Sequence, residues 1–269
     1  KTVLANEQVI DGNCDRCDSI ITQKNLNQWF LNISKYSEEL LVGLDEIGDW
    51  PENVKAMQQN WIGKSVGAQF KMNISNSDIS FEVFTTRPDT LFGMTFAVIS
   101  PEHSLMKDIL EISNNSEEIN KYITTAATKS EFERMSITKE KTGVDSGLFV
   151  INPLTNEKIP LWIADYVLVN YGTGAIMAVP AHDQRDYDFA KKYNIEIRQV
   201  ISGDPLDSNI DNKAFIDKGK LINSGEFDGL NSHDEASSKI IQKLVEIKSG
   251  EGKTTYRLRD WLISRQRYW

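Results

Sequence analysis

Two kinds of hydrophobic periodicity alternate along the chain. Apolar positions at helical spacing predict helices, and apolar positions that alternate with polar ones predict strands with one buried face. The predicted helices cover residues 27–41, 50–61, 103–136 with a break at 114–116, 183–193 and 231–247. The predicted strands cover residues 68–74, 79–86, 95–99, 147–151, 161–169, 175–179 and 197–201.

The order of these elements predicts the fold class. The strands at 68–74 and 79–86 should form a hairpin, because Asn-Ser-Asp at 76–78 supplies turn residues between them. Residues 203–231, rich in Gly, Asp, Asn and Ser, predict an irregular excursion, and Gly-Glu-Gly at 250–252 predicts a hinge. Helices and strands interleave without a regular strand–helix–strand rhythm, so we expect an α+β fold.

The composition is that of a globular protein with one large core or two modest ones. The 269 residues are 40% hydrophobic and 26% charged, and no apolar run approaches the length of a membrane span. The start of the chain lacks a signal pattern, so we expect a cytoplasmic protein without a membrane partner. The net charge of −9 argues against extensive phosphate binding, so any nucleic acid should be held locally.

Cys14 and Cys17 are the two cysteines of the chain. Two cysteines exclude a disulfide framework and indicate a reducing compartment. Their C-x-x-C spacing is half of a zinc site, but the chain supplies no second Cys or His pair. We therefore expect no bound metal here.

The run TTRPDTLFG at residues 85–93 gathers hydroxyl and charged side chains directly after a predicted strand. Pro88 restricts its own backbone and moves Arg87 away from the helical region, which makes the turn stiff. Such a cluster at a rigid strand end is typical of a small-molecule site. An ordinary turn, in which Asp89 satisfies backbone groups, explains the same residues equally well.

A second cluster follows the glycines of Gly172-Thr173-Gly174 and ends in a helix start. Asp183 stands where an N-cap residue belongs, and this structural role is favoured over a catalytic one. Asp186 on the first turn can anchor a ligand ammonium through charge-assisted hydrogen bonds. His182 has no Ser or Cys nucleophile beside it, so a structural role is favoured, and a metal site at His182, Asp183 and Asp186 is weaker still.

Together these segments resemble the editing insertion of bacterial-type leucyl-tRNA synthetases, which are class I enzymes. TTRPDTLFG and GTGAIMAVPAHDQRDYDFA occur in the order of that family, and the flanking ANEQVIDGNCDRC, WPENVKAMQQNWIGKS and RDWLISRQRYW also agree with it. Valyl and isoleucyl enzymes have related insertions, but the DTLFG continuation and the HDQRD helix start favour the leucyl type. The resemblance covers nearly the whole chain.

The resemblance implies a mixed, β-barrel-like core with surrounding helices and helical or β linkers at both ends. It implies an editing domain at 64–252 between connecting segments at 1–63 and 253–269, which lead to the rest of the synthetase chain. The His-Ile-Gly-His and Lys-Met-Ser-Lys-Ser signatures are absent from this sequence. We therefore expect no cofactor here, since ATP and Mg²⁺ serve the aminoacylation site of the parent enzyme.

The function implied by the resemblance is hydrolysis of the ester on mischarged tRNA(Leu). The noncognate groups are isoleucine, norvaline and methionine, and the partner is the 3′ acceptor end that carries them. In the family, the threonine matching Thr90 blocks leucine, and the aspartate matching Asp186 binds the α-ammonium. The resemblance implies catalytic positions at Thr85, Thr86 and Asp183, and substrate-binding positions at Arg87, Thr90, Met177, Val179, His182 and Asp186.

Two other functions stay open. The chain could bind the tRNA acceptor end without turnover, or it could be a small-molecule hydrolase on an unrelated α+β fold. Since no serine–histidine or thiol pair is evident, the default mechanism for hydrolysis is attack by a positioned water without a covalent intermediate. Hydroxyl groups at Thr85 and Thr86, with backbone amides, would then stabilise the oxyanion.

Overall fold

The computed structural model describes residues 4, 8–10, 12–22, 27–127, 134, 140–169, 172–203, 210 and 212–263. The chain divides into two compact units. The larger unit runs from Gly67 to Ala127 and continues to Lys253, and the smaller unit takes in both ends of the chain, up to Val66 and from Thr254. How these units correspond to functional domains stays a prediction.

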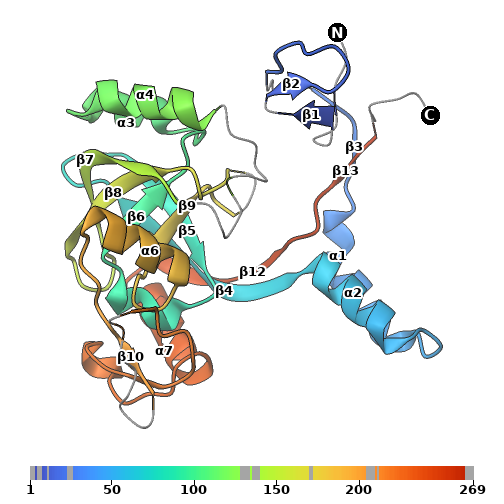
Figure 1. Cartoon of the computed structure of the whole chain (residues 1–269). Coiled ribbons are helices and arrows are strands. Elements are labelled where there is room, and N and C mark those ends of the chain that lie inside the picture. Colours follow the sequence, from blue (N-terminus) through green and yellow to red (C-terminus); the bar gives the residue numbers. More distant parts are fainter. Residues whose placement is uncertain are drawn as a thin grey trace. The chain divides into compact units, whose positions relative to one another are not determined.

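A three-stranded and a four-stranded sheet build the larger unit (Figure 1). The three-stranded sheet has the order β12-β4-β5, formed by β12 Gly250–Tyr256, β4 Lys64–Asn73 and β5 Ser80–Thr85. The four-stranded sheet has the order β7-β8-β6-β9, formed by β7 Gly143–Ile151, β8 Lys158–Ala164, β6 Phe96–Ile99 and β9 Ala175–Ala178. β4 and β5 pair antiparallel with Ala68 opposite Thr85, which confirms the predicted hairpin.

The inner faces of these sheets share one hydrophobic core. Side chains at alternating positions of each strand point into it, because successive side chains of a strand face opposite sides. The core contains Ala68, Phe70, Met72, Phe81, Val83, Ala97, Ile99, Leu161, Ile163, Met177 and Val179. β5 and β9 lie side by side, but no hydrogen-bonded ladder joins them. Among the described residues the sheets do not close into a barrel, so the α+β class is confirmed and the barrel-like core is not.

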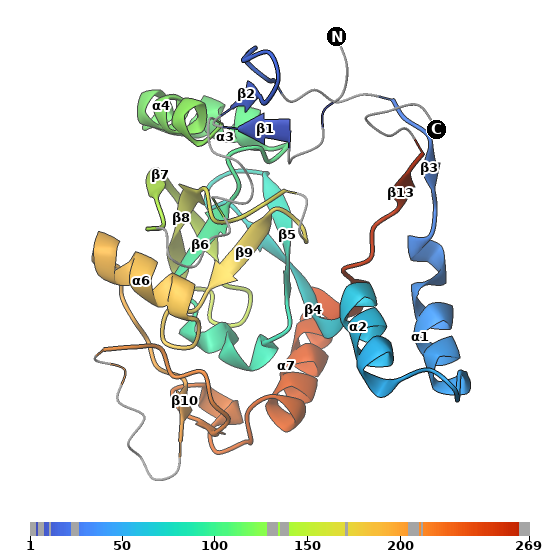
Figure 2. The same cartoon turned by 45° about the vertical axis from the view of Figure 1, so that its right-hand side comes forward.

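Helices cover this core on several sides. Helix α6 (Gln184–Tyr193) lies on the outer face of the four-stranded sheet (Figure 2). There the Phe189 ring packs 5.4 Å from the rings of Phe96 and Trp162. Helix α7 (Asp234–Glu246) packs against the short helix η3 (Pro88–Gly93). The predicted 103–136 segment forms α3 (Met106–Ile112) and α4 (Ser116–Ala126), with the predicted break between them. Residues 128–133 and 135–136 of that prediction lie outside the described residues.

The excursion at 203–231 is irregular, as predicted, apart from β11 (Lys220–Leu221) and η4 (Gly225–Phe227). Residues 204–209 and 211 lie outside the described part of the chain. The strand predicted at 197–201 is mostly wrong, since only β10 (Ile201–Ser202) forms there, paired with β11. The hinge predicted at 250–252 is also wrong, because these residues begin strand β12.

The smaller unit contains short paired strands and two helices. Its elements are β1 Val9–Ile10, β2 Asn13–Cys14, β3 Phe30–Leu31, η2 Ser34–Tyr36, α1 Ser37–Glu46, α2 Glu52–Ile62 and β13 Trp261–Leu262. The helix predicted at 27–41 begins late because Phe30–Leu31 pairs with Trp261–Leu262 instead. The helix predicted at 50–61 is confirmed as α2, which ends at Gly63 in the left-handed conformation.

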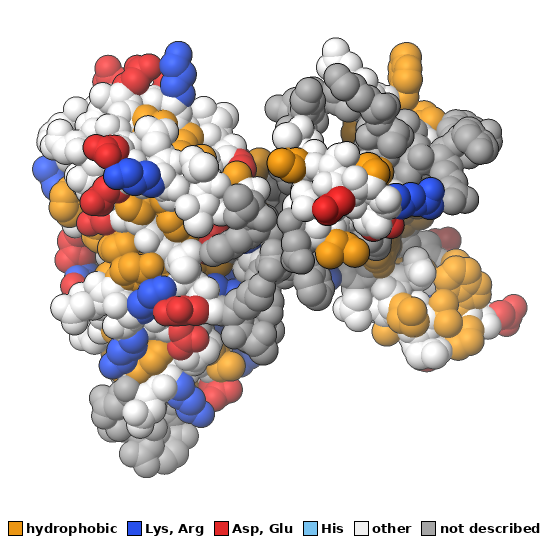
Figure 3. Space-filling model, turned by 45° about the horizontal axis from the view of Figure 1, so that its top comes forward, with side chains coloured by type: hydrophobic (Ala, Val, Ile, Leu, Met, Phe, Trp, Pro, Cys, Tyr) orange, Lys and Arg blue, Asp and Glu red, His pale blue; other side chains and the backbone are white. Residues whose placement is uncertain are grey.

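Large apolar side chains lie exposed on the smaller unit, on the right of Figure 3. Trp29 is 81% exposed and Trp61 65%, far above the values of core residues. No helix among the described residues is long and apolar enough to cross a membrane. Within the same residues, no group of three or more His, Cys, Asp or Glu could hold a metal ion, and Cys14 and Cys17 have free thiols.

Candidate functional site

The first motif forms a locked turn at the end of β5. Arg87 has φ −123° and ψ 61°, away from the helical region as Pro88 requires, and Pro88 begins η3. The Arg87 N–H donates to Thr85 Oγ1 at 3.0 Å, and the Thr90 hydroxyl donates to the Arg87 carbonyl at 2.8 Å. The turn therefore fixes both threonine side chains relative to one backbone unit. Thr85 is half-buried, Thr86 is exposed and Thr90 is only 1% exposed.

A glycine on the neighbouring strand determines where this turn lies. A Cβ atom at Gly67 would lie 1.9 Å from the carbonyl oxygen of Thr85, closer than any real contact. The absence of a side chain at Gly67 thus lets β4 pack directly against the end of β5.

Asp89 stabilises the turn through buried hydrogen bonds. It is fully buried and accepts hydrogen bonds from Nε and Nη2 of Arg87, each at 3.0 Å, and from the backbone N–H of His233 at 3.0 Å. Burial alone would raise the pKa of Asp89, but the hydrogen bonds and charge of Arg87, together with His233, bring it below its ordinary value. The structural interpretation of Asp89 is therefore correct. Nε and Nη2 of the Arg87 guanidinium are occupied by this ion pair.

The second motif begins at the end of β9. Met177 and Val179 are buried in the shared core, and Thr95, just before β6, donates its N–H to the Ala178 carbonyl at 3.3 Å. Asp183 is the N-cap of α6, as predicted, and accepts from the N–H groups of Arg185 at 2.8 Å and Asp186 at 3.3 Å. It also forms an ion pair with the Arg185 guanidinium at 3.1 Å.

Asp186 has a different environment from that of Asp183. It is 3% exposed, its Oδ2 accepts from the Val179 N–H at 2.9 Å, and its Oδ1 accepts from the Tyr166 hydroxyl at 3.2 Å. Burial, followed by the charge of Asp183, raises the pKa of Asp186 to about 8. None of the described cationic side chains is in ion-pair contact with it. The carboxyl group is thus oriented by neutral donors, and the nearby charge of Arg185 only partly offsets its burial.

Both ring nitrogens of His182 form hydrogen bonds with backbone groups. Its Nε2 accepts from the N–H groups of Val200 at 3.0 Å and Ile201 at 3.2 Å, so Nδ1 carries the proton and donates to the Phe215 carbonyl at 2.9 Å. Burial lowers the pKa of His182 to about 4, which keeps the ring neutral. Because both ring nitrogens of His182 are occupied by hydrogen bonds, only its ring carbons could contact a substrate. This favours the structural interpretation of His182.

The two motifs lie next to each other. β5 and β9 are neighbours, and the charges of Arg87 and Asp89 both act on the His182 ring. Two surface hollows, of about 500 and 480 Å³, lie elsewhere, and neither is lined by a residue of the two motifs. The proposed site residues differ in burial: Thr86 is exposed and Asp183 half-buried, whereas the buried ones are Thr90, Met177, Val179 and Asp186.

Comparison with known proteins identifies the family of the chain. The family model for the leucyl-tRNA synthetase editing domain matches residues 59–245. The chain belongs to this editing-domain family. Leucine–tRNA ligases of Clostridium botulinum, strain Langeland, and Caldanaerobacter subterraneus are 56% and 54% identical to it over its whole length. The chain spans about a third of each of these relatives, 32% of their length.

A solved structure supports the same assignment. The LeuRS–tRNA–LeuAMS ternary complex of Agrobacterium radiobacter contains a LeuRS chain that matches with a TM-score of 0.73 and 36% identity. The match covers all of this chain and 30% of that one. The editing-domain fold is therefore established for the chain.

Sequence reasoning missed three residues that shape the candidate site: Gly67, Tyr166 and His233. Gly67 lies directly before the strand predicted at 68–74, and a glycine in a strand often marks close backbone approach, so a strand prediction that began earlier would have pointed to it. Tyr166 lay inside the strand predicted at 161–169, which in fact ends at Ala164. His233 is linked to Asp89 across 144 positions, and no local pattern indicates such a pair.

Proposed function

We propose that the chain hydrolyses the ester of noncognate aminoacyl groups on tRNA(Leu). Isoleucine, norvaline and methionine are the groups removed, and leucine is rejected. Synthetase pockets separate apolar side chains by only about 1–3 kcal/mol per methylene, so a second, hydrolytic selection is needed for accuracy. Membership of the editing-domain family supports this role.

The observation that carries the proposal is the buried carboxyl group of Asp186, with which none of the described cationic side chains forms an ion pair. A buried carboxylate without a cation carries a desolvation penalty, and its raised pKa, about 8, reflects that penalty. The α-ammonium of an aminoacyl ester supplies the missing charge and forms a charge-assisted hydrogen bond with it. Asp183 does not fit the same role, because Arg185 already pairs with it.

Thr90 supplies the selection against leucine. Its hydroxyl is held by the Arg87 carbonyl at 2.8 Å, which also fixes the direction of its methyl group. A fixed methyl group in a nearly buried position excludes a side chain that branches toward it, whereas a mobile group would yield. We therefore assign the steric block to Thr90, with Met177 and Val179 as the apolar surroundings of the accepted side chains.

Hydrolysis proceeds by attack of a positioned water on the ester carbonyl. The Thr85 hydroxyl oxygen accepts from the Arg87 N–H, so the hydroxyl proton of Thr85 can be donated to another acceptor. This hydroxyl group and that of the exposed Thr86 stabilise the oxyanion. The oxygens of Asp183 already accept from backbone and guanidinium donors, so they are less available to take a proton from the water. Asp183 therefore contributes by fixing the start of α6, which carries Asp186. Water is the only co-reactant of this step. Its oxygen bonds to the carbonyl carbon, the ester bond to the ribose oxygen breaks, and the ribose leaves as a hydroxyl group that carries a proton from the water.

The acceptor end of tRNA(Leu) and the remainder of a leucine–tRNA ligase are the proposed partners. The net charge of −9 suits a domain that grips only the 3′ end and leaves the tRNA body to other parts of the ligase. Exposed Trp29, Trp61 and Trp261 on the smaller unit suit contact with that remainder. Aminoacylation, with its ATP and Mg²⁺, is assigned to the two thirds of the ligase that this chain does not span.

Single-turnover deacylation of Ile-tRNA(Leu) by excess protein tests the proposal. We expect the parent chain to release isoleucine and Asp186→Ala to abolish the release. Asp188→Ala is the matched control, because Asp188 lies exposed on the same helix and, among the described residues, accepts from Gln184 alone. Equal rates for the two variants would remove Asp186 from the site. Norvalyl and methionyl tRNA(Leu) extend the substrate range.

The same assay separates the alternative functions. A module that only binds the acceptor end protects the ester without any protein-dependent release, and the parent chain would then equal the buffer blank. A small-molecule hydrolase would instead cleave an aminoacyl ethyl ester that has no adenosine. Either result would replace the proposed editing reaction.

A further inference from the structure

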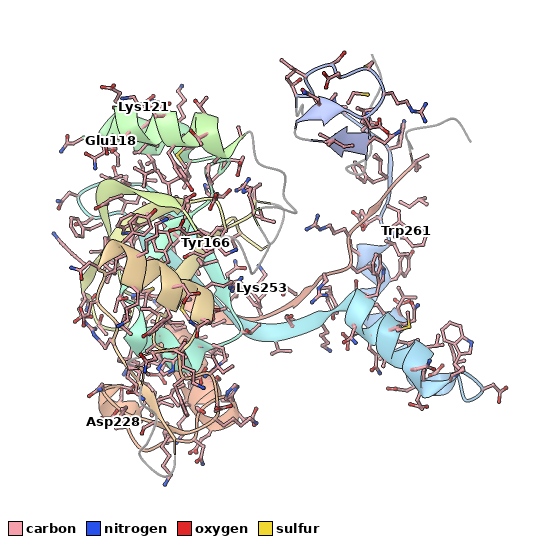
Figure 4. All side chains as sticks on the ribbon, in the orientation of Figure 1. Glu118, Lys121, Tyr166, Asp228, Lys253 and Trp261 are labelled. Atoms are coloured by element: carbon pink, nitrogen blue, oxygen red, sulfur yellow. The ribbon has the colours of Figure 1, made fainter. Side chains whose placement is uncertain are left out.

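Tyr166 lies two residues after β8, inside the larger unit and against helix α6 (Figure 4). It is 7% exposed, and its ring centroid lies 5.5 Å from that of Phe189. Phe189 in turn packs against Phe96 and Trp162, so the phenol ring is held by a close-packed aromatic cluster. The position of the hydroxyl is therefore set by the core of the fold and not by a surface loop.

The hydroxyl of Tyr166 and the N–H of Val179 together orient the Asp186 carboxylate. Each donates to a different oxygen, at 3.2 Å and 2.9 Å. A carboxylate bonded at one oxygen can still turn about its last torsion, and a second donor at the other oxygen stops that rotation. Each oxygen keeps a second lone pair, so a ligand donor can bind without displacing either protein donor.

We propose that Tyr166 is a positioning residue, which fixes the Asp186 carboxylate in the orientation that receives the substrate ammonium. This inference rests on the proposed editing function. The hydroxyl suits both states of Asp186, since it can donate to the carboxylate or accept from the protonated carboxyl group. When the ammonium binds, the donating arrangement supports the negative charge on Asp186.

The charged and titratable groups around Asp186 give this role a measurable signature. Burial, and after it the charge of Asp183, raises the pKa of Asp186. The hydrogen bond from Val179, the charge of Arg185 and the hydrogen bond from Tyr166 lower it. Removing the Tyr166 hydroxyl should therefore raise the pKa of Asp186 further. Loss of packing alone would weaken the protein without moving that pKa.

The test compares Tyr166→Phe with Tyr187→Phe in this chain. Tyr187 is also buried and adjoins Asp186 in sequence, but its hydroxyl donates to the Ile210 carbonyl at 2.9 Å. We expect Tyr166→Phe to raise the half-saturating concentration of Ile-tRNA(Leu) roughly ten-fold, which corresponds to about 1.4 kcal/mol, with a smaller effect on the maximal rate. The alkaline-rising limb of activity should move up by about one pH unit. Tyr187→Phe should leave both unchanged.

Two further measurements do not depend on editing. Titration of the Asp186 carboxyl carbon by NMR should show a higher pKa in Tyr166→Phe and no change in Tyr187→Phe. Replacing Tyr166 with 3-fluorotyrosine keeps the hydroxyl and makes it a stronger donor, so the Asp186 pKa should fall. An Asp186 titration that is the same in all four proteins overturns the positioning role, even if the parent edits normally. Absence of deacylation by the parent, with the titration shifts intact, refutes the proposed function and not the contact.

Discussion

Replacing Asp186 with asparagine should remove part of the pH dependence of the free energy of unfolding. Burial raises the pKa of Asp186 from its ordinary value of 3.8 to about 8, so the folded chain binds a proton that the unfolded chain has released. Stability then falls as the pH rises from near 4 through 8, because the folded state must either keep that proton or bury a charge. Asparagine carries no charge in either state, so the variant lacks this loss.

The magnitude follows from the size of the pKa change. One pKa unit corresponds to about 1.4 kcal/mol, so the stability attached to Asp186 should fall by about 4 kcal/mol between pH 5 and pH 9, as an upper figure. Asparagine keeps the local hydrogen bonds, since its oxygen can accept from the Val179 N–H and its amide can donate to the Tyr166 oxygen. Asp186→Asn should thus be more stable than the parent at pH 9, while the difference shrinks at pH 5.

Urea unfolding of parent and variant at pH 5, 7 and 9 measures this difference. Every other titrating group is common to both proteins, so the subtraction isolates Asp186. Asp188→Asn serves as the control, because its carboxylate is exposed and its substitution should give a constant offset. Parallel stability profiles for the parent and Asp186→Asn would refute the reasoning that burial raises the pKa of Asp186 in the folded chain.

Two further substitutions test the other parts of the site. Thr90→Ala removes the fixed methyl group, so the variant should hydrolyse Leu-tRNA(Leu), which the parent spares; continued discrimination in single-turnover assays would take the steric role from Thr90. Gly67→Ala places a Cβ 1.9 Å from the Thr85 oxygen and should cost about 1–3 kcal/mol in urea unfolding and slow deacylation by displacing that turn. Gly252→Ala is its control, since its Cβ would meet Ile241 at an ordinary 3.4 Å, and similar losses in both variants would contradict the close-approach argument.

Local patterns predicted the parts of the fold that local interactions determine. The β4–β5 hairpin, the break between α3 and α4, and the Asp183 cap of α6 all follow from a few adjacent residues. Both motifs of the site could be recognised for the same reason. Their residues are close in sequence, and each motif lies at the end of a strand.

Pairings between segments that are distant in sequence could not be predicted from local patterns. Residues 30–31 lie in a helical pattern but form a strand because they pair with Trp261–Leu262. Residues 250–252 have hinge composition, yet their strand pairs with β4. The hydrogen bonds of His182 to Val200 and Phe215 follow from such distant contacts, so the sequence could favour its structural role but could not name its partners.

The bond between Asp89 and the His233 amide also constrains the order in which the site can form during synthesis. The ribosome makes the chain from its N-terminus, and 144 residues separate the two partners. A nascent chain that ends before residue 233 already contains TTRPDTLFG and HDQRD, but its buried Asp89 lacks a backbone donor. The backbone donor to Asp89 is therefore added only when α7 begins to emerge, after both sequence motifs have already been translated.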